Sequence, residues 1–112
     1  MRSASEGLAL RVYLGNGDRH EGRLVHELLL EEAARRGLNG GTVLRGISGF
    51  GASHRIHAES QGPGHAEDLP VVIEIVDRED RIQGFLPFVD SVVEEGLVSL
   101  TRVSVIRYER GR

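Results

Sequence analysis

Histidine, serine and arginine side chains that could bind a ligand gather in one short stretch of this sequence. Ser53, His54, Arg55 and His57 fall within five positions, and His65 follows in the same polar segment. Two imidazoles spaced as in His54-x-x-His57 are able to bind a divalent metal. With no Cys in the chain and no carboxylate at a characteristic spacing, a complete site needs ligands from other segments or subunits. We therefore expect solvated or structural histidines and no metal, and keep metal binding as an alternative.

Nucleophilic catalysis has no sequence pattern to support it. Ser48 and Ser53 flank a glycine motif, but no Gly-x-Ser-x-Gly elbow is present, and no Asp has a spacing that completes a triad. The absence of Cys also removes a thiol nucleophile. We expect a protein that is not an enzyme and that uses no cofactor.

Glycines mark the start of the polar segment. In Gly49-Phe50-Gly51 two residues without a Cβ permit close backbone approach to a ligand and a nest of N–H groups for an anion. The following residues, Ala52 to Asp68, contain few apolar side chains and exceed the usual length of a structureless connection. We interpret residues 52–68 as a mobile binding loop, with a tolerated insertion as the alternative.

Hydropathy periods predict the elements that position these residues. Alternation of apolar and polar residues predicts a strand from Leu8 to Leu14, and β-branched runs predict others. Helical spacing predicts two helices, the second with Pro87 inside it, which should kink or divide it. Asp77 is the expected N-cap of that helix. The further predicted elements are a helix over 22–36, strands over 42–50, 71–76 and 98–108, and, after Asp77, a second helix whose apolar stripe covers 82–93.

This order, βαββαβ, predicts an α+β ferredoxin-like sandwich. Both helices cover one face of the sheet, so Tyr13 and the second faces of the later strands need cover from another subunit. Glu74 lies within an apolar strand, and a carboxylate there is expected to pair with an Arg from a neighbouring strand or subunit.

Composition restricts the classes of partner. The 112 residues carry 17 acidic and 14 basic side chains, a net charge of -3, with no basic cluster that would bind nucleic acid. No apolar run is long enough for direct membrane insertion or for a signal sequence, so we expect a cytoplasmic protein. The expected organisation is a flexible N-terminus, residues 1–7, and a single domain over 8–112.

Several motifs together resemble one family. Tyr13-Leu14-Gly15, Arg45-Gly46-Ile47, Gly49-Phe50-Gly51, Leu69-Pro70 and Phe85-Leu86-Pro87 are similar to the PII nitrogen-regulatory proteins and more closely to their PII-like relatives, the DUF190 family. The similarity runs from Leu8 to Tyr108. It implies a homotrimer of ferredoxin-like subunits, small ligands bound in clefts between subunits, and a mobile loop that contacts a target protein, with a membrane transporter or channel among the candidate targets.

The resemblance also implies site residues. The ligand-binding set is Thr42, Gly49, Phe50, Gly51, Glu74 and Arg107, and the effector-loop set is Ser53, His54, Arg55 and His57. Where PII proteins have a cationic phosphate loop, Glu94-Glu95-Gly96-Leu97 stands here. We therefore expect a small anionic ligand of low charge rather than ATP. The alternative is a trimeric, CutA-like protein that binds divalent metal through His54, His57 and His65.

Overall fold

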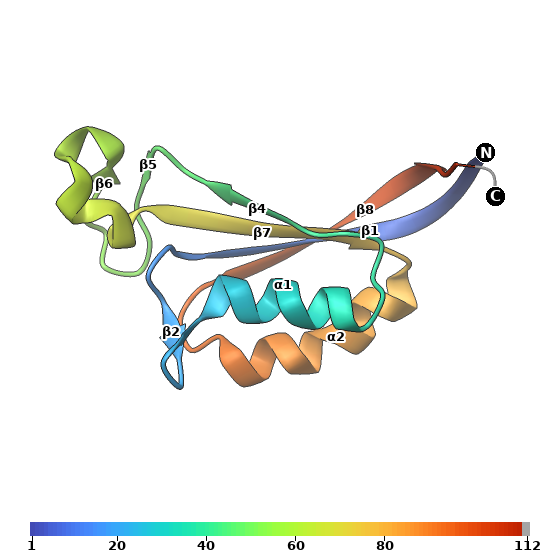
Figure 1. Ribbon diagram of the computed structural model, residues 1–112, viewed down its shortest axis with the longest axis horizontal. Coiled ribbons are helices and arrows are strands. Elements are labelled where there is room, and N and C mark those ends of the chain that lie inside the picture. Colours follow the sequence, from blue (N-terminus) through green and yellow to red (C-terminus); the bar gives the residue numbers. More distant parts are fainter. Residues whose placement is uncertain (111–112) are drawn as a thin grey trace.

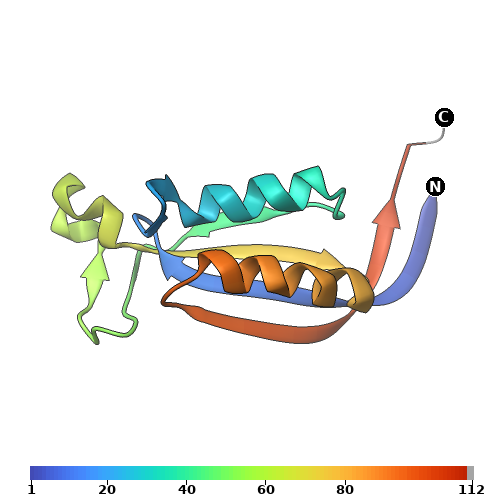
Figure 2. The ribbon, with the colours of Figure 1, turned by 90° about the horizontal axis from the view of Figure 1, so that it is seen from below.

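The computed structural model describes residues 1–110 and has two layers (Figures 1 and 2). One layer is a four-stranded antiparallel sheet in the order β4-β7-β1-β8, and the other consists of two helices on one face of this sheet. The main elements are β1 (Arg2–Gly15), α1 (Val25–Arg35), β4 (Thr42–Arg45), β7 (Pro70–Asp77), α2 (Glu79–Val92) and β8 (Leu97–Tyr108). The predicted α+β ferredoxin-like order is confirmed.

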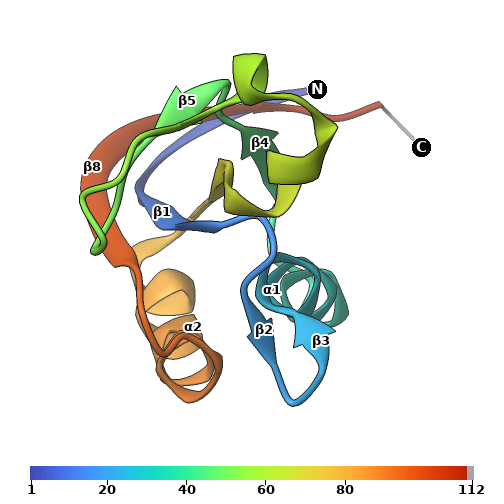
Figure 3. The same ribbon diagram turned by 90° about the vertical axis from the view of Figure 1, so that its left-hand side faces the viewer.

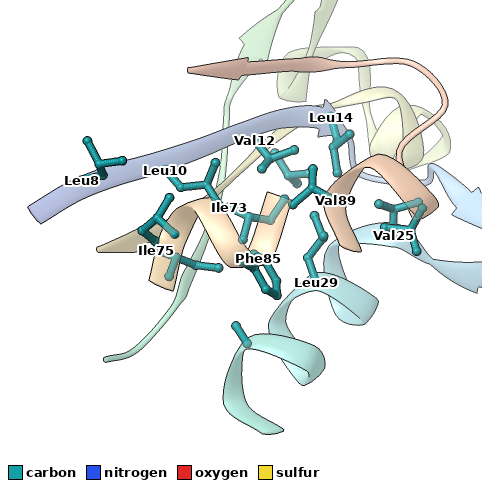
Figure 4. Packing of buried hydrophobic residues seen from close by; sticks show 14 residues of the cluster. Leu8, Leu10, Val12, Leu14, Val25, Leu29, Ile73, Ile75, Phe85 and Val89 are labelled. Atoms are coloured by element: carbon teal, nitrogen blue, oxygen red, sulfur yellow. The ribbon is translucent and has the colours of Figure 1, made fainter. Parts of the chain in front are cut away.

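The core lies between the sheet and the helices (Figure 4). The alternating residues Leu8, Leu10, Val12 and Leu14 of β1 all turn to the helical layer and are buried. Every second residue of β7 does the same because successive strand side chains point to opposite faces. Phe85 of α2 is among the largest fully buried side chains. No helix within residues 1–110 combines the length and apolarity needed to span a lipid bilayer.

Local sequence explains the end of α1 but not the start of α2. Gly37 has φ +71° just after α1, and its N–H donates to the Ala34 carbonyl while the Leu38 N–H donates to that of Ala33. This is a Schellman ending, in which glycine supplies the left-handed residue. The expected N-cap role of Asp77 is wrong: Asp77 is a buried strand residue whose carboxylate accepts hydrogen bonds from the Arg78 N–H at 2.7 Å and a second backbone N–H at 2.9 Å.

Pro87 does not divide α2, which runs without a break from Glu79 to Val92. The proline removes one backbone hydrogen bond, but buried side chains before and after it hold the helix on the sheet. These side chains are Ile82, Phe85, Val89 and Val92.

The predicted start of the first strand at Leu8 is wrong. β1 begins at Arg2 and pairs with β8 without interruption from Arg2–Tyr108 to Tyr13–Leu97. β7 ends opposite Leu8, so residues 2–7 and the end of β8 form a two-stranded ribbon beyond the sheet (Figures 1 and 2). Pairing with β8 rather than hydropathy alternation extends the strand. The flexibility of residues 1–7 stays a prediction.

Much of the predicted loop 52–68 is folded, so its description as structureless is wrong. It contains β6 (His57–Ala58), which pairs with β5 (Ser48–Gly49), and 3-10 turns over Glu59–Gln61 and Pro63–Asp68. The short hairpin β2 (Arg19–His20) and β3 (Arg23–Leu24) completes the fold. All of the β5–β6 region lies at the end of the sheet opposite the chain termini, and Figure 3 shows this end.

Hydrogen bonds hold the second half of this segment to the turn after β1. The Asn16 N–H donates to the Leu69 carbonyl at 2.7 Å, and the Gly17 N–H donates to that of Glu67 at 2.9 Å. The Asn16 side chain donates to the Ala66 carbonyl at 3.1 Å. Only residues 50–56 of the β5–β6 segment lack a helix or strand, so the freely projecting part is much shorter than predicted.

Candidate ligand site and target loop

The face of the sheet opposite the helices is uncovered in the single chain. Leu44 and Leu97 on its edge strands are 54% and 64% exposed, and Tyr13 between them is also exposed. Large apolar side chains on a flat sheet face usually pack against another surface. The sequence predicted this uncovered face, because the βαββαβ order places both helices on the other face of the sheet.

A polar network crosses the middle of the uncovered face. Glu74 of β7 accepts a hydrogen bond from the Arg11 guanidinium of β1 at 2.8 Å, and Arg11 also donates to the Thr101 hydroxyl of β8 at 3.5 Å. The predicted pairing of Glu74 with an arginine of a neighbouring strand is confirmed. Thr42, from the predicted ligand set, is the β4 residue opposite Glu74. Arg11 was not predicted, although it is the one charged residue among the alternating positions 8–14.

The two glycines of Gly49-Phe50-Gly51 have different structural roles. A Cβ on Gly49 would lie 3.0 Å from the Pro70 ring, so packing against Pro70 accounts for a glycine there. A Cβ on Gly51 would have no atom of residues 1–110 within 4 Å, and Gly51 does not adopt a left-handed conformation. Neither packing nor backbone conformation therefore requires glycine at position 51, which leaves this backbone open to a ligand.

The side chains of residues 50–56 project at the end of the sheet. Phe50 is exposed, and its ring centroid lies 6.0 Å from that of His54. The His54 N–H donates to the Gly51 carbonyl at 2.9 Å and closes the turn. Arg55 and Ser53 are also exposed. The predicted effector residues 53–55 therefore lie together at the projecting turn, whereas His57 belongs to β6.

The histidines do not form a metal centre in the described residues of one chain. His57 Nδ1 lies 4.0 Å from an Asp68 carboxylate oxygen, and His54 Nδ1 lies 3.1 Å from the Ala52 carbonyl oxygen. Within residues 1–110, no three His, Cys, Asp or Glu side chains come together as a metal site. The CutA-like alternative thus gains no support from the arrangement of His54, His57 and His65.

Arg107, the cationic member of the predicted ligand set, lies far from the glycine motif. It pairs with Ser3 in the ribbon, and its guanidinium is 3.3 Å from the Glu109 carboxylate. The glycine motif lies beside Pro70, which pairs with Gly15. Twelve strand residues at roughly 3.3 Å each separate Ser3 from Gly15, or about 40 Å. One chain cannot bring Arg107 and Gly51 to the same small ligand.

Negative charge surrounds the position of the missing cationic loop. An open pocket of about 240 Å³ between the end of β1 and the end of α2 is lined by Asp18, Arg19, Glu94 and Glu95, among others. Three carboxylates against one guanidinium disfavour a polyphosphate at this end of the fold. The preference for a ligand of low charge stays a prediction.

Two relatives of known source match most of this chain. A UPF0166 protein of Aquifex aeolicus is 37% identical over 97 residues, 87% of this chain and 90% of the relative. A UPF0166 protein of Methanocaldococcus jannaschii is 37% identical over 101 residues, 89% of this chain and 92% of the relative.

Solved structures of the CPII protein from Thiomonas intermedia, described as a nitrogen regulatory PII-like protein, share the fold. The form bound to ADP, AMP and bicarbonate has a TM-score of 0.58 at 20% identity, covering 92% of this chain and 91% of CPII. The apo form has a TM-score of 0.55 at 19% identity, covering 96% and 100%. The model of the DUF190 family, described as an uncharacterized ACR, matches residues 7–105. The chain therefore belongs to the DUF190 family and has a PII-like fold.

Proposed function

We propose that this protein is a cytoplasmic PII-like regulator that forms a homotrimer, binds a small anionic ligand between subunits and contacts a target protein through residues 52–68. One observation carries the proposal: Arg107 pairs with Ser3, whereas the glycine motif lies beside Pro70 at the Gly15 end of β1, about 40 Å away along that strand. A ligand that needs both must bind where the loop end of one subunit meets the ribbon of another. The function is regulatory and includes no reaction.

The uncovered sheet face supports the assembly. Its exposed apolar residues, Tyr13, Leu44 and Leu97, would be removed from water by packing against other subunits. Complete burial of one such side chain is worth about 1.5–3 kcal/mol. Light scattering tests this directly, since the proposed trimer has three times the 12.3 kDa mass of the chain.

The chemistry of the ligand follows from the charges at the two ends. Arg107 is a guanidinium that can hold a phosphate or carboxylate with two hydrogen bonds, and the backbone at Gly51 is open. Glu94 and Glu95 oppose additional phosphate groups. CPII of the same fold was solved with ADP, AMP and bicarbonate, which supports testing nucleotides and bicarbonate first. We propose a preference for AMP, cyclic AMP or a small carboxylate or bicarbonate over ATP.

Calorimetry with AMP, cyclic AMP, bicarbonate, ADP and ATP tests the proposal. We expect a ligand of low charge to bind more tightly than ATP, and Arg107→Ala or Gly51→Val to weaken it at least tenfold, because each removes one half of the site. Arg102→Ala is the matched control, since Arg102 lies on the same strand but pairs with Glu79 of α2. Tightest binding by ATP, or unchanged affinity in Arg107→Ala, would overturn the proposed site.

A further inference from the structure

One stretch at the projecting end of the sheet is basic although the chain as a whole is acidic, whereas the adjoining 3-10 turns at the same end carry Glu59, Glu67 and Asp68. Residues 45–58, from the end of β4 through β6, contain two arginines and two histidines but no Asp or Glu, whereas the chain as a whole has a net charge of -3. We call these residues the basic tip. A local positive charge on an acidic protein favours an acidic partner at this place and repels a basic one.

The arginines of the basic tip have no partner within residues 1–110. Arg45 and Arg55 take part in no side-chain hydrogen bond or ion pair there, and Arg2 and Arg110, near the chain ends, are alike in this respect. Every other described arginine side chain donates to a carboxylate or carbonyl oxygen or lies within 4.0 Å of a carboxylate. The basic tip therefore has two guanidiniums, those of Arg45 and Arg55, whose N–H donors are available to a partner.

Apolar side chains accompany these charges. Ile47, Phe50 and Ile56 are 72%, 64% and 67% exposed, and all three fall within ten positions of the basic tip. The β5–β6 pairing of Ser48 with Ala58 and Gly49 with His57 fixes the base of this hairpin. Phe50 and the two arginines of this short segment are of residue types that are enriched at protein interfaces.

We propose that the basic tip binds an acidic protein surface that has an apolar pocket, with Arg45 and Arg55 facing carboxylates and Phe50 and Ile56 entering the pocket. This inference rests on the proposed function, which assigns the segment to a target, and it specifies the chemistry of that target. A lipid surface fits less well, because membrane-binding polybasic segments carry about four to eight Lys or Arg and the basic tip carries two.

An array of 15-residue synthetic peptides tests the inference. The peptides contain Asp and Glu with Leu and Phe, Asp and Glu alone, Leu and Phe alone, or Lys with Leu and Phe. We expect the full-length protein to bind the acidic-apolar peptides at least tenfold more tightly than any other class. Arg45→Glu with Arg55→Glu should reverse the preference toward the Lys-containing peptides. Arg2→Glu, which reverses an arginine without a described partner at the opposite end, should leave the preference unchanged.

Separate variants test whether Phe50 and Ile56 bind an apolar pocket of the partner. Phe50→Ser and Ile56→Ser should each weaken the acidic-apolar peptides to the level of the purely acidic ones, whereas Tyr108→Ser, at an exposed aromatic of the ribbon, should not. Equal binding of all peptide classes would overturn the inference, and so would binding unaffected by the tip variants. Binding to phosphatidylserine vesicles but to no peptide would overturn it in favour of lipid.

The small-ligand calorimetry separates a failure of this inference from a failure of the proposed function. Loss of peptide selectivity with intact, Arg107-dependent binding of the small ligand would overturn the basic tip alone. Selective peptide binding without any small ligand would overturn the regulatory site and leave the chemistry of the tip in place.

Discussion

Replacing Glu74 by Gln gives a direct energetic test of whether the uncovered sheet face is buried in the assembled protein. The substitution keeps the shape of the side chain but removes the charge that pairs with Arg11 at 2.8 Å. In the single chain both side chains are 34% exposed. Water can then solvate an unpaired Arg11, and a pair of this kind contributes about 0–1 kcal/mol.

Burial of this face in an assembly would raise the free-energy contribution of the Arg11–Glu74 pair. If other subunits cover the face, Glu74→Gln leaves a buried guanidinium without its counterion, and removing one partner of a buried pair costs about 3–5 kcal/mol. We expect a loss of about 3 kcal/mol, which at about 2 kcal/mol per M of urea shifts the unfolding midpoint by about 1.5 M. The double variant Arg11→Met with Glu74→Gln should recover much of this loss, since it leaves no unpaired charge.

Urea unfolding at several protein concentrations is the assay, because the stability of an oligomer depends on protomer concentration. Glu79→Gln is the control: it breaks the pair with Arg102, whose N and O atoms lie 3.4 Å apart in an exposed position, and should cost less than about 1 kcal/mol. A Glu74→Gln effect no larger than that of Glu79→Gln, with a midpoint independent of concentration, would refute the buried-face reasoning.

Three further outcomes are expected. Gly49→Ala should lower the melting temperature, because its Cβ meets the Pro70 ring at 3.0 Å, whereas Gly51→Ala, whose Cβ has no described atom within 4 Å, should not; equal melting temperatures would contradict these roles. Brief trypsin treatment should cut first after Arg55, in the part of the segment without helix or strand, and mass spectrometry locates the cut; first cleavage elsewhere would be evidence against a projecting turn. Hydrogen bonds from Arg35 and Arg36 lower the pKa of Glu32 to about 2, so its stabilisation is present above its ordinary pKa of 4.5 and lost as the pH falls toward 2; unfolding of Glu32→Gln should differ from wild type at pH 7 and converge with it near pH 2.

Elements with their own hydropathy period were predictable, and elements that depend on distant partners were not. The alternation from Leu8 to Leu14 identified the core face of β1, since burial on one side imposes the period. Residues 2–7 have no such period and become a strand because β8 pairs with them. The segment after Gly51 looked structureless because the hydrogen bonds from Asn16 and Gly17 that hold it come from residues far away in the sequence.

In the candidate site, too, local patterns were predictable and the identity of distant partners was not. Pairing of Glu74 with an arginine was predictable because a carboxylate within an apolar strand needs a partner, but its identity as Arg11 depends on strand register. The motif Gly49-Phe50-Gly51 predicted one role, close approach of the backbone to a ligand, for both glycines, whereas packing against Pro70 explains Gly49 alone. The separation of Arg107 from Gly51 follows from topology, which a linear motif does not contain.

Mixed trimers test the central claim, a ligand site shared between two subunits, most directly. Gly51→Val damages the loop half of every site, and Arg107→Ala damages the other half, so neither homotrimer should bind the ligand that wild type binds most tightly in the nucleotide and bicarbonate series. Refolding the two variants together in equal amounts should restore wild-type affinity at about one site in four, where an intact Gly51 meets an intact Arg107. Calorimetry that finds no recovery in the mixture would contradict a shared site.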